Sequence, residues 1–182
     1  MVKELVERIR QKERRAMSEL YQLYVEELSS VCYRYVPAES DAKDVLQNSF
    51  VKIFTAIHTV DYRSDEAFRG WLKRVVVNEA LSFLRSRKRL LFVDTDSEQL
   101  EQVADVEEPA TEMVSPDELH RLIGELPVGY RTVVNLYVFE GYSHRQIAEL
   151  LGIKASTSAS QLYFAKQVLA REIKKLKNEN DG

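Results

Sequence analysis

Hydrophobic residues recur at intervals of three and four along most of this chain, which is the repeat of one face of an α-helix. In the C-terminal half, Leu162, Ala165, Leu169, Ile173 and Leu176 form such a stripe. Glycine and proline, which interrupt helices, number only 6 and 4 among the 182 residues. The pattern therefore predicts an all-α protein.

The N-terminal half is expected to form a bundle of about three helices between Ala16 and Arg89. Their apolar residues fall within positions 20–35, 42–57 and 68–76. Ser40 and Asp41 have side chains that suit an N-cap, so the second helix is expected to begin there. Trp71, on the third helix, is expected to belong to the core.

The C-terminal half has the pattern of a helix-turn-helix. Ser143 is a natural N-cap, Ile147 lies on an apolar edge, and Gly152 can take the left-handed conformation that ends a helix. A second helix is expected to begin near Ser156 or Thr157. An ordinary helical hairpin with a solvated outer face would show the same pattern, so the pattern alone does not establish DNA binding.

The outward face of that second helix is where DNA would bind. The residues opposite its apolar stripe are Thr157, Ser160, Phe164, Gln167 and Arg171. A recognition helix presents this kind of face to the major groove.

Composition narrows the function. The chain has one cysteine, which cannot form an internal disulfide, and three scattered histidines without metal-ligand spacing. The sequence shows no paired carboxylates, no activated nucleophile and no glycine-rich phosphate loop. An enzyme, a cofactor and a small-molecule substrate are therefore not expected. No signal peptide is visible and no apolar run reaches about 18 residues, so a cytoplasmic protein is expected. His120 and His144 are expected to be exposed.

Charge divides the chain into three parts. Residues 91–116 carry eight acidic side chains and no basic ones, whereas the net charge of the whole chain is −3. Residues 1–90 carry +4 and residues 117–182 carry +1. Residues 91–116 are therefore expected to form a flexible acidic linker between two small helical domains. The linker is either a solvated spacer or an anionic strand that occupies a channel built for nucleic acid.

Two polar clusters in the N-terminal half have two interpretations each. The helix that carries Phe50 has a polar ridge opposite its apolar side, made of Asp44, Gln47, Asn48 and Val51. This ridge is either a solvated face or a docking surface. The third helix ends in the basic cluster Arg85, Arg87, Lys88 and Arg89. That cluster is either a solvated helix end or a phosphate-binding site.

Two blocks of sequence resemble one known family. The segments Asp41–Phe50 and Phe68–Leu81, with the basic cluster after them, resemble region 2 of bacterial sigma factors of the sigma-70 family, in the small extracytoplasmic-function (ECF) class. The segment Leu126–Ser143, which runs into the helix-turn-helix, resembles region 4. Together they cover residues 16–176. The resemblance implies an alternative sigma factor that binds core RNA polymerase and directs initiation at −35 and −10 promoter elements.

The resemblance also implies residue roles in the first domain, residues 1–90. The ridge would dock on the clamp helices of the large polymerase subunit. The residues expected to capture a flipped base of the melted −10 element are Asp61, Tyr62, Arg63 and Ser64. Asn78 would face the non-template strand, and the basic cluster would hold phosphates.

In the second domain, residues 117–182, the resemblance implies contact with the double-stranded −35 element. The residues expected there are Arg145, Ser156, Thr157, Ser160, Gln161, Phe164, Lys166 and Arg171. The family commonly has basic residues where this chain has Ala159, Gln161 and Phe164. Free affinity for DNA is therefore expected to be weak and to depend on tethering to polymerase.

The resemblance implies two further features. The acidic linker would thread toward the active-site cleft of polymerase, and an anti-sigma factor, often membrane-bound in this class, would hold the protein inactive. A stand-alone helix-turn-helix regulator remains the alternative, and it would need enough positive charge to bind DNA unaided.

Overall fold

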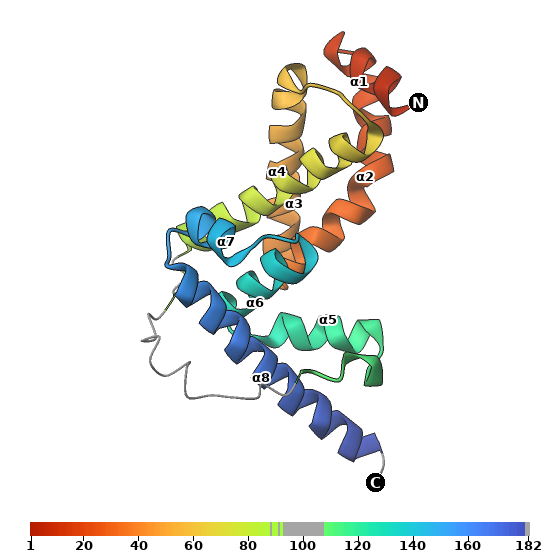
Figure 1. Cartoon of the computed structure of the whole chain (residues 1–182). Helices are drawn as coiled ribbons and strands as arrows, with labels where there is room; N and C mark the ends of the chain where they lie inside the picture. Colours follow the sequence, from red (N-terminus) through yellow and green to blue (C-terminus); the bar gives the residue numbers. More distant parts are fainter. Residues whose placement is uncertain (88, 91, 93–107, 181–182) are drawn as a thin grey trace. The chain divides into compact units, whose positions relative to one another are not determined.

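The computed structural model describes residues 1–87, 89–90, 92 and 108–180, and the chain divides into two compact units, Met1–Arg87 and Lys88–Gly182 (Figure 1). The described residues are mostly helical and contain no strand. This confirms the all-α fold class. Most of the predicted acidic linker, residues 91 and 93–107, lies outside the described residues.

The first unit is built around three long helices. Its elements are α1 (Val2–Arg10), α2 (Arg14–Tyr35), α3 (Glu39–Ala56), the 3-10 turn η1 (Ile57–Thr59) and α4 (Asp65–Ser86). The helices α2, α3 and α4 pack against one another in every pairing. Leu28, Ile53 and Leu72 are fully buried between them. The bundle expected from the apolar repeat is therefore present.

Two details of this unit differ from the sequence expectation. The helix α3 begins at Glu39, one residue before Ser40, and its N-cap is Ala38 without a side-chain hydrogen bond. Asp41 consequently lies inside the first turn, where its charge favours the positive end of the helix dipole instead of capping it. The first helix, α1, was not foreseen, although its buried residues Val2 and Ile9 face α2.

The turn between α1 and α2 depends on an unusual residue. Lys12 has a φ of 64°, in the left-handed region, and its backbone N–H donates to the carbonyl of Ile9 at 2.8 Å. A side chain with a Cβ is strained there, whereas glycine is not. Lys12→Gly is therefore expected to raise the free energy of unfolding by about 1 kcal/mol, measured by chemical denaturation.

The matched control for this change is the preceding residue. Gln11 has a φ of −81°, which any residue adopts. Gln11→Gly gains no relief of strain and is expected to destabilise the protein by about 0.5–1 kcal/mol. Equal effects of the two glycines would show that the left-handed turn stores no strain.

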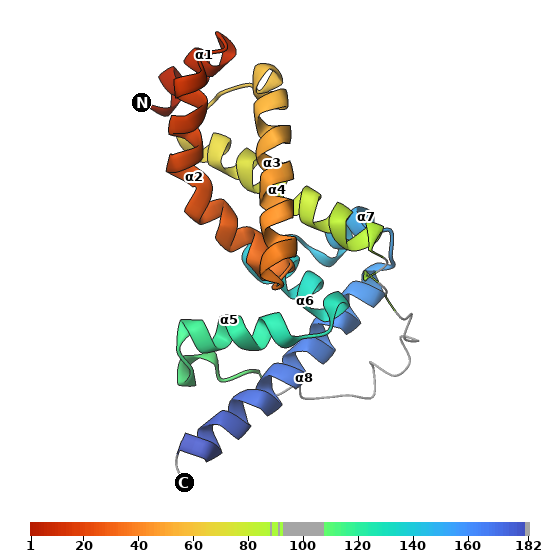
Figure 2. The same ribbon diagram turned by 180° about the vertical axis from the view of Figure 1, so that it is seen from behind.

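The second unit surrounds one long helix. Its elements are the 3-10 turn η3 (Thr111–Met113), α5 (Pro116–Glu125), α6 (Val128–Val134), the π-helical segment η4 (Asn135–Phe139), α7 (His144–Leu151) and α8 (Ala155–Asn180). Within this unit, α5, α6 and α7 pack on α8, whose length is plain from behind in Figure 2. Leu162, Ala165, Leu169 and Ile173 of the expected stripe are buried, and Leu176, its fifth residue, is half-buried.

The predicted helix-turn-helix is confirmed as α7, a short turn and α8. The Ser143 hydroxyl accepts a hydrogen bond from the backbone N–H of Gln146 at 3.2 Å, and the backbone N–H of Ser143 donates to the Gln146 side chain at 2.9 Å. This reciprocal capping box fixes the start of α7. Gly152, with a φ of 68°, ends the helix. The helix α8 begins at Ala155, just before the expected caps.

Candidate functional site

The polar ridge predicted on α3 is an exposed face. Asp44, Gln47, Asn48 and Val51 are all exposed, and their spacing places them on one side of the helix, opposite the buried Val45 and Ile53. Val51, the aliphatic residue of the ridge, is 61% exposed. A face that combines a carboxylate, two amides and an aliphatic group can bind another protein.

The segment between η1 and α4 has three side-chain interactions of its own. The Ser64 hydroxyl accepts a hydrogen bond from the Ala67 backbone N–H at 3.1 Å and so caps α4. The Tyr62 hydroxyl donates to the Asp65 carboxylate. An ion pair of 2.9 Å joins Arg63 to the Asp61 carboxylate. We call residues Asp61–Ser64 the α4 loop. Its charged side chains are exposed, so a ligand can reach them.

Aromatic packing attaches the α4 loop to the core. The ring of Tyr62 lies 5.7 Å from that of Phe68, which is 1% exposed. Trp71 stacks on Phe68 at 5.6 Å. Trp71 was expected in the core, but the structure leaves it partly exposed, because it covers Phe68 from outside. A partly exposed indole beside the α4 loop is a surface on which a base can stack.

The C-terminal half of α4 presents a polar and cationic face. Asn78 and Arg85, which are seven residues apart, are exposed on this face. Arg74, which was not among the residues predicted from the sequence, is also exposed and precedes Asn78 by one helical turn. Its helical spacing could have identified it. Arg87 is exposed, with its guanidinium 5.3 Å from the centre of the Phe83 ring.

The two remaining residues of the basic cluster follow Arg87, where the first unit ends. Arg89 is exposed. Lys88 is outside the described residues. The guanidinium groups of Arg74 and Arg85, which are exposed on one face of α4, suit the phosphates of a nucleic-acid strand, because each presents several donors in a fixed plane.

The helix-turn-helix keeps part of its predicted DNA face. Arg145, Ser156 and Arg171 are exposed. The ring of Phe164 is half-buried, because it stacks on Tyr130 of α6 at 6.1 Å. Lys166 forms an ion pair of 2.7 Å with Glu108, the last residue of the acidic run before Pro109. A DNA phosphate would have to replace that carboxylate.

Three other residues predicted for this face are buried, and their predicted exposure is wrong. Thr157, Ser160 and Gln161 are 1%, 0% and 6% exposed. Gln161 lies beside the apolar stripe, one turn before Ala165, on the side of α8 that packs against the other helices of the second unit. The Ser160 hydroxyl donates to the carbonyl of Thr157 at 2.9 Å. Because small polar side chains can satisfy their hydrogen bonds on their own helix, polarity does not make them outward-facing.

His144 is likewise not the ordinary exposed residue that was expected. It is half-buried: its ring stacks on Tyr137 at 4.6 Å, and its Nδ1 lies 2.9 Å from the Ser158 hydroxyl oxygen on α8. Burial lowers the pKa of His144 below its usual value. The residue therefore links α7 to both η4 and the start of α8 in its neutral form.

This environment predicts a pH dependence. Because the unfolded chain binds a proton more readily than the buried imidazole, the stabilisation is full above the unfolded pKa of about 6.5 and is lost as the pH falls from there toward the lowered pKa. His144→Phe retains a stacking ring that cannot titrate. We expect it to flatten the change in thermal unfolding temperature between about pH 7.5 and pH 5.5, followed by circular dichroism.

His120 provides the control for that measurement. It is exposed and also stacks on an aromatic ring, that of Phe139 at 6.1 Å. His120→Phe introduces the same side chain at an exposed histidine, so its pH profile is the reference with which that of His144→Phe is compared. If His144→Phe shows the same pH dependence of thermal unfolding as the wild type, His144 is not the source of that dependence.

Among the described residues, no group of histidine, cysteine or acidic side chains is arranged to hold a metal ion. None of the described helices is both long and apolar enough to cross a membrane.

Comparison with known families identifies two matching regions. The sequence model of sigma-70 region 2 matches residues 20–90, and that of sigma-70 region 4 matches residues 117–169. The first range includes the ridge, the α4 loop and α4. The second includes α5, α6, α7 and the first half of α8.

Similar proteins extend over nearly the whole chain. The ECF RNA polymerase sigma-E factor of Haemophilus influenzae is 31% identical, over 94% of this chain and 95% of its own length. The RNA polymerase sigma-H factor of Pseudomonas aeruginosa is 29% identical, over 97% and 95%. A similar fold occurs in the sigma factor RpoE of Bartonella quintana, solved in complex with the anti-sigma factor NepR, with a TM-score of 0.51 and 18% identity over 87% of this chain and 96% of that one.

Proposed function

This chain belongs to the ECF class of the sigma-70 family of RNA polymerase sigma factors, and we propose a role for each of its parts. It is an alternative sigma factor that binds core RNA polymerase and directs promoter-specific transcription initiation. We propose that residues 1–90 bind core polymerase and melt the −10 element, that residues 91–116 connect the domains, and that residues 117–182 bind the −35 element.

The observation that carries this proposal is the order of the two family matches along one chain, region 2 before region 4. An isolated helix-turn-helix is compatible with many DNA-binding proteins. A region 2 match implies core polymerase as a partner as well. The ridge Asp44, Gln47, Asn48 and Val51 is our proposed contact with core polymerase, because all four side chains are accessible.

For the −10 element, we propose that the α4 loop holds a flipped base. Extruding a base costs a few kcal/mol of stacking, so a pocket that binds it stabilises the melted strand. Asn78 can donate and accept hydrogen bonds at a base edge, and the cations at the end of α4 can hold phosphates. Arg74 joins this proposed surface because it shares the exposed face of Asn78.

For the −35 element, the proposed contacts are the residues of the helix-turn-helix that are exposed, Arg145, Ser156 and Arg171, and two that are partly exposed, Phe164 and Lys166. Residues 117–182 carry a net charge of only +1. Electrostatic attraction supplies most non-specific DNA affinity, so this domain alone should bind weakly. Tethering to polymerase at the promoter raises its effective concentration and compensates for that weakness.

We also propose a cytoplasmic location and an anti-sigma factor, often membrane-bound in this class, as a regulatory partner. The protein itself would catalyse no reaction and would need no cofactor. Core polymerase supplies the chemistry of RNA synthesis, and the sigma factor supplies promoter binding.

A gel-shift experiment tests the proposal against a stand-alone regulator. Fragments of genomic DNA are incubated with the protein alone, with core polymerase alone, or with both. Specific complexes are expected only with both components. Arg145→Gln/Arg171→Gln should weaken them, whereas Arg121→Gln, at an exposed residue of α5 paired with Glu125 at 2.8 Å, should not. Equally strong specific binding by the protein alone would favour the regulator.

A further inference from the structure

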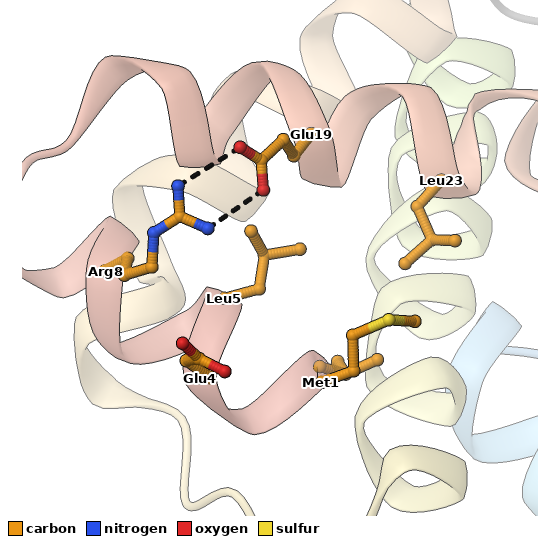
Figure 3. A pocket seen from close by; sticks show the side chains of 7 residues that line it. Met1, Glu4, Leu5, Arg8, Glu19 and Leu23 are labelled. Atoms are coloured by element: carbon orange, nitrogen blue, oxygen red, sulfur yellow. Dashed lines mark hydrogen bonds and ion pairs between the residues drawn. The ribbon is translucent and has the colours of Figure 1, made fainter.

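The N-terminal helix α1 lies outside residues 20–90, which the region 2 model matches, yet it is firmly attached to the first unit. Val6 and Ile9 on its apolar face are 0% and 2% exposed. On its other side, the Arg8 guanidinium donates to Glu13 at 2.6 Å and to Glu19 of α2 at 2.9 Å. Figure 3 shows Arg8 reaching across to Glu19 beside Leu5. The helix α1 is therefore held in a fixed position on the first unit.

Arg10, on α1, forms hydrogen bonds to a segment some fifty residues later in the chain. Its Nε donates to the carbonyl of Ile57 at 3.4 Å, and its Nη2 donates to the carbonyl of Val60. Its Nη1 donates to the Glu7 carboxylate of α1 at 2.7 Å. The planar guanidinium thus uses separate donors for two carbonyls and one carboxylate, which a lysine ammonium cannot reproduce in the same plane.

Those two carbonyls lie just before the α4 loop. Ile57 begins η1, at the end of α3, where helix carbonyls lack partners within the helix and attract a cation. Val60 is the residue that precedes Asp61. At the far end of the loop, Ser64 caps α4. The α4 loop is therefore held at both ends, by Ser64 on one side and by Arg10 of α1 on the other.

We propose that Arg10 is a positioning residue for −10 recognition: it fixes Val60 so that the α4 loop is already ordered before a base binds. This inference rests on the proposed role of the α4 loop in −10 binding. A loop that is free at one end loses conformational entropy when it closes on a ligand, whereas a preorganised loop does not. Loss of Arg10 should therefore weaken −10 binding and base discrimination while core binding and −35 binding persist.

The test compares holoenzymes that contain wild-type protein, Arg10→Met or Arg10→Lys. The ligand is a fluorescent single-stranded oligonucleotide with the non-template −10 sequence of a promoter that the wild-type holoenzyme transcribes, and a second oligonucleotide carries one substituted −10 base. We expect Arg10→Met to bind the matched strand about tenfold more weakly and to discriminate less between the two strands. Arg10→Lys should lose part of this discrimination.

The ratio of the two affinities separates positioning from folding. A variant that is merely less stable lowers the active fraction for both oligonucleotides equally and leaves their ratio unchanged. Glu7→Gln is the matched control, because it removes the exposed ion pair of Arg10 but leaves both carbonyl bonds in place. It should discriminate as the wild type does.

The discrimination between the two oligonucleotides decides whether Arg10 positions the α4 loop. Wild-type discrimination in Arg10→Met overturns the inference and leaves the proposed function intact. Should Arg10→Met fail to fold, wild-type discrimination in Arg10→Lys overturns it equally. A wild-type holoenzyme that does not distinguish the two strands would refute the −10 role of the α4 loop, and the inference would fail with it.

Discussion

Replacing Asp44 and Gln47 together with alanine is expected to weaken binding to core polymerase by roughly 2–4 kcal/mol, which is the range of an interface hot spot. Both side chains are exposed on one face of α3, and neither contributes to the buried core. The free energy of unfolding should therefore change by less than about 0.5 kcal/mol. Competition with a labelled sigma factor for core polymerase measures the affinity, and chemical denaturation measures the stability.

The matched control lies on the neighbouring helix. Gln22 and Glu26 of α2 are also exposed and also combine an amide with a carboxylate. Gln22→Ala/Glu26→Ala should bind core polymerase as the wild type does. If Asp44→Ala/Gln47→Ala also binds normally, the ridge on α3 does not dock on polymerase.

Phe68→Ala is expected to have the largest effect on stability, a loss of about 3–5 kcal/mol. Phe68 is 1% exposed, and the rings of Tyr24, Tyr62 and Trp71 surround it at 6.3, 5.7 and 5.6 Å. Truncation leaves a cavity between three aromatic rings and removes the support of Tyr62 in the α4 loop. Phe68→Leu, which fills more of the space, should cost less than about 1.5 kcal/mol.

Trp71 makes this measurement specific to the first unit. It is the single tryptophan of the chain and stacks on Phe68, so its fluorescence reports the unfolding of that unit. Phe164→Ala, in the second unit, should leave the transition unchanged. A loss below about 1 kcal/mol for Phe68→Ala would mean that the surrounding rings collapse into the cavity and that Phe68 does not support the α4 loop.

Most of the helices could be predicted because their evidence is local. The apolar stripe of α8 repeats every three or four residues. Ser143 indicates the start of α7 because its side chain can cap a helix, and Gly152 indicates the end because it can take the left-handed conformation. The accessibility of the ridge also follows from helical spacing. By contrast, α1 ends at a turn where Lys12 adopts a conformation that usually indicates glycine, so the sequence lacks the usual signal.

The remaining features depend on contacts between residues far apart in the sequence. His144 lies within hydrogen-bond distance of Ser158, and Arg10 donates hydrogen bonds to the carbonyls of Ile57 and Val60. A backbone carbonyl carries no side-chain signature, so periodicity cannot reveal such a partner. Helical spacing placed Thr157 opposite the apolar stripe, and the family resemblance placed Gln161 on the DNA face, although the burial of both depends on how α8 packs.

In vitro transcription with mapping of start sites tests the central claim most directly. The purified protein is added to core RNA polymerase on genomic DNA, and the 5′ ends of the transcripts are sequenced. The account predicts new start sites at a subset of promoters that share one −35 and one −10 sequence at constant separation, and their loss with Asp44→Ala/Gln47→Ala. Transcripts whose start sites are the same with and without the protein would contradict it.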